Sequence, residues 1–175
     1  LFGEVNPAGK LPLTFPRSVG QLQMIYNHKP SQYFHKYAFE KVTPLYPFGH
    51  GLSYSNFEYS EFEVNEIVND KISISVNLKN DSDIDGAEVV QLYFRDSFSS
   101  VTRPVKELVR YSRVFVKAGE TVSVDFDLEI KDLAFYDINM NYCVEEGEFE
   151  FMVGGSSDNK YLISETLDIK KRYDF

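Results

Sequence analysis

The sequence has 175 residues, and its 18 Lys and Arg against 27 Asp and Glu give a formal net charge of −9. That length suits one ordinary domain with an appendage. An acidic surface without a basic cluster repels phosphate backbones, so nucleic acid is not an expected partner. No stretch approaches the roughly 20 consecutive apolar residues of a membrane span, and the first residues lack the basic, then apolar pattern of a signal peptide. We therefore expect a soluble chain without a membrane partner.

The amino-acid composition favours strands over helices. Hydrophobic residues make up 43% of the chain, which argues against disorder, and the 15 Phe and 12 Tyr far outnumber the five alanines. Ten of these aromatics lie within residues 26–59. The single cysteine, Cys143, cannot form an internal disulfide, so a disulfide-stapled scaffold is excluded while the compartment stays open.

Apolar and polar residues alternate with period two from residue 57 onward, as in strands that bury one face. The alternation is clearest over residues 71–79 and 121–130. Further strands are predicted at residues 108–116, 133–136, 148–153 and 161–169. Turn-forming residues lie between the strands, at residues 80–86, 118–119, 146–147 and 154–159.

Two other strand segments carry more specific predictions. Residues 57–67 form an opening strand whose apolar phase slips, which predicts a bulge near Ser60 and Glu61. Residues 89–94 are apolar on both faces apart from Gln91, which predicts a central strand with a neighbour on each side.

Short strands at this spacing, without a helical segment between them, predict an all-β domain over residues 56–175. The expected architecture is a two-sheet, immunoglobulin or fibronectin III-like β-sandwich. We expect the longer link at residues 96–106 to cross from one sheet to the other.

Residues 1–55, which we call the strap, have a different character. They contain six of the seven prolines, each of which removes a backbone donor. Residues 10–15 are expected to form at most a short edge strand, and the remainder an extended segment. Aromatic side chains left in water forfeit about 1.5–3 kcal/mol each. The strap is therefore expected to run across a surface and bury its rings, and whether that surface belongs to this chain is left open.

Several motifs resemble one enzyme family. Residues 6–17, 19–21 and 26–29 resemble the end of the second, α/β domain of glycoside hydrolase family 3 enzymes. Residues 44–54 look like the segment that leads into the fibronectin III-like C-terminal domain of that family, and three further segments are similar to signatures of this domain: 86–93, 104–108 and 147–150. The strap would then come from an α/β domain. One departure lies at residues 142–147, where relatives often have Trp in place of Tyr142 and Pro before the glycine.

The resemblance implies a parent enzyme of β-glucosidase or β-xylosidase type, which retains configuration by using a carboxylate nucleophile and a carboxylic acid/base. It also implies that the nucleophilic Asp belongs to a barrel domain and the acid/base Glu to the second domain, both upstream of this chain. We therefore expect no catalytic residue, cofactor or metal here. The expected role is to brace the upstream catalytic domains, which would bind the β-glucoside, and the strap is a candidate for self-association.

The residues themselves offer several other chemical sites. Alternation places five carboxylates on a solvated strand face, away from a glycosidase cleft: Asp125, Asp127, Glu129, Glu148 and Glu150. Residues 81–86 match the start of a calcium loop, but Leu92 stands where a bidentate Glu is needed, so a turn is preferred. Asn80 begins an N-glycosylation sequon, on which no prediction is based.

The remaining candidates are histidines, the cysteine and glycine pairs. The spacing of His28, His35 and His50 matches no metal motif, so hydrogen-bonding roles are preferred. Cys143 lacks a nearby basic partner in sequence and is expected to be a buried, idle thiol. The glycines at residues 49–51 and 154–155 lack a phosphate-loop pattern, and we predict turns and close backbone contacts there.

Two rival functions stay open at this stage. A carbohydrate-binding module would explain the many aromatics, although the chain has no Trp and most aromatics fall at positions expected to be buried. A β-sandwich that docks another protein is the other alternative, because such folds serve many functions.

Overall fold

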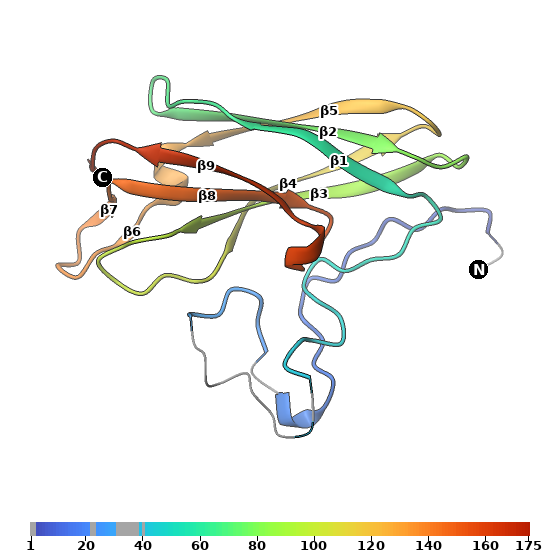
Figure 1. Cartoon of the computed structure of the whole chain (residues 1–175), viewed down its shortest axis with the longest axis horizontal. Helices are drawn as coiled ribbons and strands as arrows, with labels where there is room; N and C mark the ends of the chain where they lie inside the picture. Colours follow the sequence, from blue (N-terminus) through green and yellow to red (C-terminus); the bar gives the residue numbers. More distant parts are fainter. Residues whose placement is uncertain (1–2, 22–23, 31–38, 40) are drawn as a thin grey trace.

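The computed structural model describes residues 3–21, 24–30, 39 and 41–175, and these residues form a β-sandwich with the strap beneath it (Figure 1). One sheet has the strand order β1-β2-β5, with bounds Phe57–Val64, Lys71–Asn80 and Thr121–Glu129. The other has the order β4-β3-β8-β9, with bounds Glu107–Val116, Gly86–Asp96, Gly147–Gly154 and Ile163–Ile169. A third, small sheet closes one end with the order β10-β7-β6, with bounds Tyr173–Asp174, Tyr142–Val144 and Phe135–Tyr136.

Period-two alternation produces the core, because every second side chain points between the two large sheets. The buried faces supply Ile72, Ile74, Val76, Leu78, Val90, Leu92, Phe94, Val124, Phe126, Leu128, Phe149, Phe151 and Val153. The all-β, two-sheet fold predicted from the sequence is therefore confirmed.

The strand ends differ slightly from the predictions. The strand predicted to reach residue 130 ends at Glu129, because Ile130–Leu133 form a 3-10 turn, η2. The last predicted strand begins at Ile163, since Asn159–Tyr161 form another 3-10 turn, η3, capped by the Asp158 side chain. Strands β7 and β10 were not predicted from the sequence, because three and two residues are too short for alternation to be visible.

Two specific strand predictions are confirmed. The register between β1 and β2 shifts between Ser60 and Glu63, and Glu61 adopts a left-handed φ of 49°. Strand β3 lies between β4 and β8, so it is the central strand expected from its two apolar faces.

The prediction for residues 96–106 is wrong. This segment joins β3 to β4, which are antiparallel neighbours in the same sheet. Two crossings between the large sheets are made by the short links at residues 81–85 and 117–120, and the third, from β5 to β8, passes through the small sheet. Stacked sheets lie about 10 Å apart, and four or five residues span that distance, so a crossing does not need a long loop.

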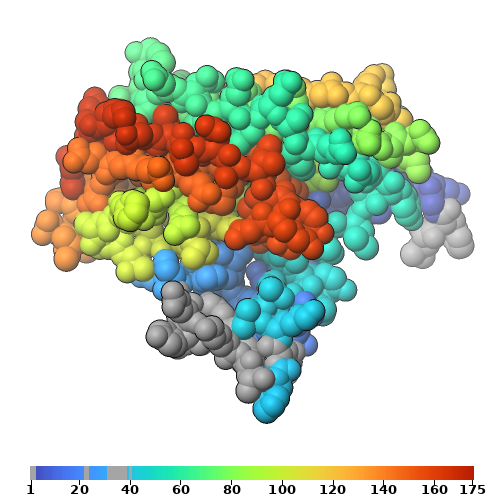
Figure 2. Space-filling model, in the orientation of Figure 1, coloured from blue at the N-terminus to red at the C-terminus, as the bar shows by residue number. Residues whose placement is uncertain are grey.

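The strap lies on the side of the four-stranded sheet, away from the sheet β1-β2-β5 (Figure 1, Figure 2). Its described residues contain one 3-10 turn, η1 (Val19–Gln21), and an antiparallel bridge between Phe15 and Tyr46. Leu11 N donates to His50 O at 2.8 Å, and Phe15 N donates to Tyr46 O at 2.8 Å. The expected edge strand at residues 10–15 is therefore reduced to a bridge, since Pro12 has no backbone donor.

Candidate functional site

The candidate site is the interface between the strap and the outer face of the four-stranded sheet. The Tyr26 ring stacks on Phe48 with centroids 4.4 Å apart, and it meets Tyr93 of β3 edge-on at 5.8 Å. Tyr93 is fully buried, and burial raises the pKa of its hydroxyl. These three rings form the apolar centre of the interface and explain why β3 is apolar on its outer face.

Two linked side-chain hydrogen bonds lie beside this aromatic centre. The Tyr93 hydroxyl donates to Gln91 Oε1 at 2.6 Å, and Gln91 Nε2 donates to the Gly155 carbonyl at 2.6 Å. Gly49 lies directly over Gln91 with φ of +78°, and a Cβ on Gly49 would lie 2.2 Å from Gln91 Oε1. The close contact predicted for the glycines at residues 49–51 is confirmed at Gly49, because only glycine fits at this position.

A buried ion pair joins the strap to β3. Lys10 Nζ lies 2.6 Å from Glu88 Oε1, and the two side chains are only 16% and 8% exposed. Glu88 also accepts from the Val89 backbone N–H at 2.8 Å. The neighbouring Tyr59 hydroxyl has no hydrogen-bond partner among the described residues, and burial raises its pKa well above the usual value. The sequence did not predict this pair, because Lys10 and Glu88 are far apart in the chain and neither lies in a local pattern that indicates an ion pair.

The Lys10–Glu88 corner opens into a cavity of about 310 Å³. Its polar lining includes Lys10 and Glu88, and its aromatic lining includes Tyr59, Tyr161 and Phe57. A site with charged groups beside aromatic faces is chemically suited to a polyhydroxylated ligand.

Asn6 fastens the beginning of the described strap. Its Nδ2 donates to Ser55 Oγ at 2.8 Å and to the Asp85 carbonyl at 2.9 Å. Its Oδ1 accepts from Ser53 Oγ at 3.0 Å and from the Tyr54 backbone N–H at 2.9 Å. One amide side chain therefore ties both ends of the strap to the link between the two sheets.

The far side of the strap is held by the loop after β3 and the loop after β8. Val105 N donates to the His28 carbonyl at 2.9 Å, and Ser157 N donates to the Phe48 carbonyl at 2.9 Å. Lys106 is buried, and its Nζ donates to the Ser157 carbonyl at 2.9 Å. Burial lowers the pKa of this ammonium group.

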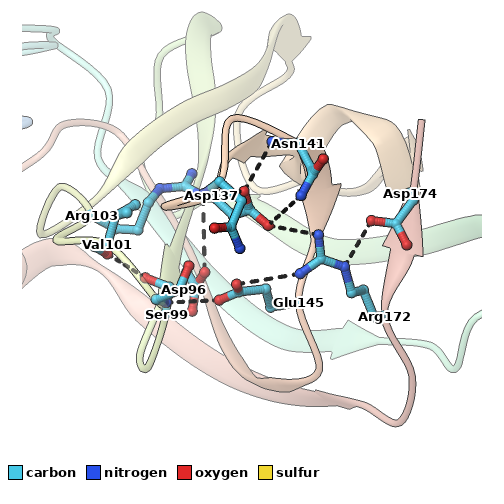
Figure 3. Close-up of polar contacts among 11 residues, drawn as sticks. Asp96, Ser99, Val101, Arg103, Asp137, Asn141, Glu145, Arg172 and Asp174 are labelled. Atoms are coloured by element: carbon cyan, nitrogen blue, oxygen red, sulfur yellow. Dashed lines mark hydrogen bonds and ion pairs between the residues drawn. The ribbon is translucent and has the colours of Figure 1, made fainter.

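A second polar cluster lies at the end of the sandwich, around Arg172 (Figure 3). Arg172 Nη2 donates to Asp137 Oδ2 at 2.8 Å, and its guanidinium also pairs with Asp174 at 2.7 Å and Glu145 at 3.7 Å. Asp137 Oδ1 accepts from the Asn141 backbone N–H at 2.9 Å. The Arg172 hydrogen bond holds the pKa of Asp137 well below its usual range. The cluster ties β10 to the β6–β7 turn.

Cys143 lies beside this cluster and is fully buried, as predicted. Burial raises the pKa of its thiol, so the unreactive form is favoured. Ligand atoms of Asp137, Cys143 and Glu145 lie within 4.8 Å of one another, but both carboxylates already face the Arg172 guanidinium. Cys143 has no basic neighbour in the sequence, but the fold brings Arg172 close to it.

The loop at residues 96–106 is anchored by a buried carboxylate. The Asp96 side chain is 1% exposed, and its Oδ2 lies 3.9 Å from Arg103 Nη1 without a hydrogen bond to any described residue (Figure 3). Burial raises the pKa of Asp96 to about 6. The Arg103 guanidinium lies over the Phe135 ring at 4.4 Å and pairs with Glu107 at 2.7 Å. The long loop therefore packs on the sandwich end.

The carboxylates considered from the sequence do not converge. Asp125, Asp127, Glu129 and Glu148 are exposed, and Glu150 is half-buried. The first three belong to β5 and the last two to β8, in different sheets. These carboxylates do not form a catalytic pair in the structure.

The loop at residues 81–86 is a link between sheets. Asn80 is fully buried, and its Nδ2 donates to the Val116 carbonyl at 3.0 Å and to the Ile84 carbonyl at 2.8 Å. Asp85 Oδ1 accepts from the Ala118 N–H at 2.8 Å. The turn preferred from the sequence is therefore present. The sequon asparagine therefore has a structural role, with its amide buried and hydrogen-bonded in the folded protein.

Of the hydrogen-bonding roles preferred from the sequence, the structure shows one at His28, whereas His50 packs against an aromatic ring. His50 stacks on Tyr46 with centroids 4.9 Å apart, and His28 Nδ1 lies 3.0 Å from the Lys29 carbonyl. His35 lies outside the described residues. Among the residues described, no helix is long and apolar enough to cross a membrane.

Two sequence models match the chain. Residues 1–54 match the glycosyl hydrolase family 3 C-terminal domain, and residues 88–157 match the fibronectin type III-like domain. A "Putative beta-xylosidase" of Formosa agariphila is 44% identical over 160 residues, which cover 90% of this chain. A "Periplasmic beta-glucosidase" of Salmonella typhimurium is 39% identical over 170 residues, again 90% of this chain. The chain spans 21% and 22% of the lengths of these two relatives.

Solved structures agree with the sequence comparisons. A β-glucosidase from Erythrobacter marinus matches with a TM-score of 0.88 and 42% identity, over 95% of this chain and 22% of that one. A β-glucosidase from Listeria innocua, in complex with isofagomine, matches with a TM-score of 0.85 and 34% identity, over 96% of this chain and 25% of that one. The strap and sandwich are thus similar to one continuous part of much longer enzymes.

Proposed function

Because this chain belongs to glycoside hydrolase family 3, we propose that its strap and sandwich brace the catalytic domains of a retaining β-glucosidase. In this proposal residues 1–55 are the end of an α/β domain with its linker, and residues 56–175 are the fibronectin III-like domain. The interface carries the proposal: the strap is fixed to the sandwich by the Lys10–Glu88 ion pair and the Tyr26–Tyr93 contact. A segment of one domain held this firmly by another transmits rigidity between them.

We place both catalytic carboxylates outside this chain. A retaining glycosidase needs two carboxyl groups about 5–5.5 Å apart that flank a sugar. The exposed or half-buried carboxylates of β5 and β8 belong to separate sheets, and the deeply buried Asp96 and Asp137 each face an arginine. None of these groups is arranged as the reaction requires.

The first test is activity. The purified 175-residue chain, incubated with p-nitrophenyl β-glucoside and β-xyloside, should release no more nitrophenol than buffer alone. Turnover above that rate would place catalytic groups inside the chain and overturn this part of the proposal.

The second test addresses bracing. A polypeptide carrying the upstream domains is compared with the same polypeptide lacking residues 56–175. Removal of the sandwich should lower the midpoint of thermal unfolding of the catalytic domains and reduce their hydrolysis of the β-glucoside. Unchanged stability and activity would contradict a bracing role.

Carbohydrate binding is a second candidate, favoured by the cavity of about 310 Å³ beside Lys10, Glu88 and Tyr161. Calorimetric titration of the chain with glucose and cello-oligosaccharides distinguishes the two functions. Heat that saturates, and that disappears in the Tyr161→Ala variant, would establish a binding module. Bracing predicts no binding heat at millimolar sugar.

A further inference from the structure

The two outer faces of the sandwich differ in chemistry. On the sheet β1-β2-β5, the outward positions of β2 and β5 carry only polar or charged side chains: Lys71, Ser73, Ser75, Asn77, Lys79, Thr121, Ser123, Asp125, Asp127 and Glu129. On the four-stranded sheet, most outward positions of β3 and β4 carry apolar or aromatic side chains, with Gln91, Arg95 and Arg113 as the exceptions: Ala87, Val89, Gln91, Tyr93, Arg95, Tyr111, Arg113 and Phe115. A sandwich that met only water would have two polar faces.

The strap accounts for only part of the second face. It covers Tyr93 and Gln91, which are 0% and 3% exposed. Tyr111 is the β4 partner of Gln91, yet it is 71% exposed, and Phe115, the partner of Ala87, is 59% exposed. The apolar face therefore continues past the edge of the strap onto β4.

The chemistry of this uncovered strip is that of a protein interface. Aromatic residues and arginine are enriched at the centres of interfaces. Arg113 lies on the same face between Tyr111 and Phe115, its side chain is exposed, and it forms no ion pair with the residues that the structure describes. The fitting partner is an apolar protein surface that offers a carboxylate to Arg113.

The course of the strap indicates where that partner enters. Asn6 donates to the Asp85 carbonyl at 2.9 Å, and Asp85 lies two positions before Ala87, which pairs with Phe115. The beginning of the strap is thus close to the Phe115 end of the exposed strip. Apolar strap side chains are exposed as well, with Leu13 at 51% and Val19 at 83%.

We propose that Tyr111, Arg113 and Phe115 form a docking strip for the part of the α/β domain that precedes the strap in the same polypeptide. The strip and the strap would then hold that domain at two places, and this inference rests on the proposed bracing function. The same-chain occupant is favoured over a second copy, because the strip adjoins the strap and the relatives are far longer than this chain.

The test compares two matched double variants in a polypeptide that carries the upstream domains. Tyr111→Lys/Phe115→Lys alters the strip, and Ser75→Lys/Thr121→Lys adds the same charge to the opposite face. The first should lower the midpoint of thermal unfolding by at least about 4 °C and accelerate proteolysis between the domains, while the control leaves both unchanged. A Tyr111→Thr/Phe115→Thr variant, which keeps β-propensity and adds no charge, should show the same loss.

The isolated 175-residue chain provides the folding control. Its unfolding midpoint should be the same with and without the strip substitutions, because these side chains contact water there. Strip variants indistinguishable from the control in the longer polypeptide would overturn the inference. So would a dimer of the isolated chain that Tyr111→Lys/Phe115→Lys dissociates. If deletion of residues 56–175 destabilises the catalytic domains while the strip variants do not, bracing stands and only the strip fails.

Discussion

Lys10 of the strap and Glu88 of β3 form a 2.6 Å ion pair in which both side chains are largely removed from water. Deleting one member of such a pair leaves the other charge buried without compensation, whereas deleting both removes the problem. The pair therefore makes the docking of the strap on the sandwich specific to one arrangement.

Lys10→Met should lower the free energy of unfolding by about 3 kcal/mol, because the Glu88 carboxylate stays buried and unpaired. Lys10→Met/Glu88→Gln should recover part of that loss. The matched control is Lys79→Met, since the Lys79–Asp81 pair is 42% and 48% exposed and should contribute within about 0.5 kcal/mol. Urea denaturation of the four proteins measures these differences, and equal losses for Lys10→Met and Lys79→Met would contradict a buried pair.

Asp96 should make stability depend on pH. Its folded-state pKa of about 6 lies above the ordinary value of 3.8, so the folded protein binds this proton more tightly than the unfolded chain does. The stabilisation that comes from protonated Asp96 is fully present below pH 4 and is lost as the pH rises through 6. At about 1.4 kcal/mol per pKa unit, the loss is on the order of 3 kcal/mol.

The neutral Asp96→Asn variant isolates this effect. Its stability relative to the unsubstituted chain should improve steadily between pH 4 and pH 7.5, as followed by denaturation at each pH. Asp125→Asn, on the exposed face of β5, is the control and should show no such trend. A pH-independent difference for Asp96→Asn would show that the carboxyl is ionised throughout the range.

The periodicity of the sequence predicted the core and most strands, since alternation alone decides that Ile72, Ile74 and Val76 share one face. It could not predict β7 and β10, because strands of three and two residues are too short for alternation and are defined by their pairing with each other and with β6. The periodicity also could not predict the interface between the strap and the sandwich. Lys10 and Glu88, or Asp137 and Arg172, are ordinary surface residues by local pattern and become partners only through the fold.

The long loop after β3 shows a different limit. Its length suggested a crossing between sheets, but that length is used to bury Asp96 and Arg103 at the sandwich end. Sequence indicates how far a loop reaches, whereas the packing of its side chains decides where it goes.

Arg172→Gln should loosen the end of the sandwich and expose Cys143. The Arg172 hydrogen bond lowers the pKa of Asp137, so its stabilising contribution is present above about pH 4 and disappears as the pH falls below that value. The destabilisation caused by Arg172→Gln should accordingly be clear at pH 7 and shrink in acid. At pH 7, Cys143 should react faster with a thiol reagent such as Ellman's reagent.

Arg110→Gln is the comparison for that experiment. Arg110 pairs with Asp132, and neither residue hydrogen-bonds to Asp137, Glu145 or Asp174 of the Arg172 cluster, so its loss should leave thiol labelling unchanged. Labelling of Cys143 at the same rate in all three proteins would show that the Arg172 cluster does not protect the thiol.

Gly49→Ala should destabilise the strap more than a matched glycine substitution elsewhere. Gly49 and Gly119 have similar left-handed φ values of +78° and +73°, so alanine pays a comparable backbone cost of about 1 kcal/mol at each. At Gly119 the added Cβ meets nothing within 4 Å, whereas at Gly49 it would lie 2.2 Å from Gln91 Oε1 and displace the side chain that bonds Gly155.

The difference between the two variants in urea denaturation therefore isolates the contact of the strap with β3. We expect Gly49→Ala to lose at least about 1 kcal/mol more than Gly119→Ala, because Gln91 must abandon a buried hydrogen bond. Equal losses would mean that the strap does not press on β3 in solution.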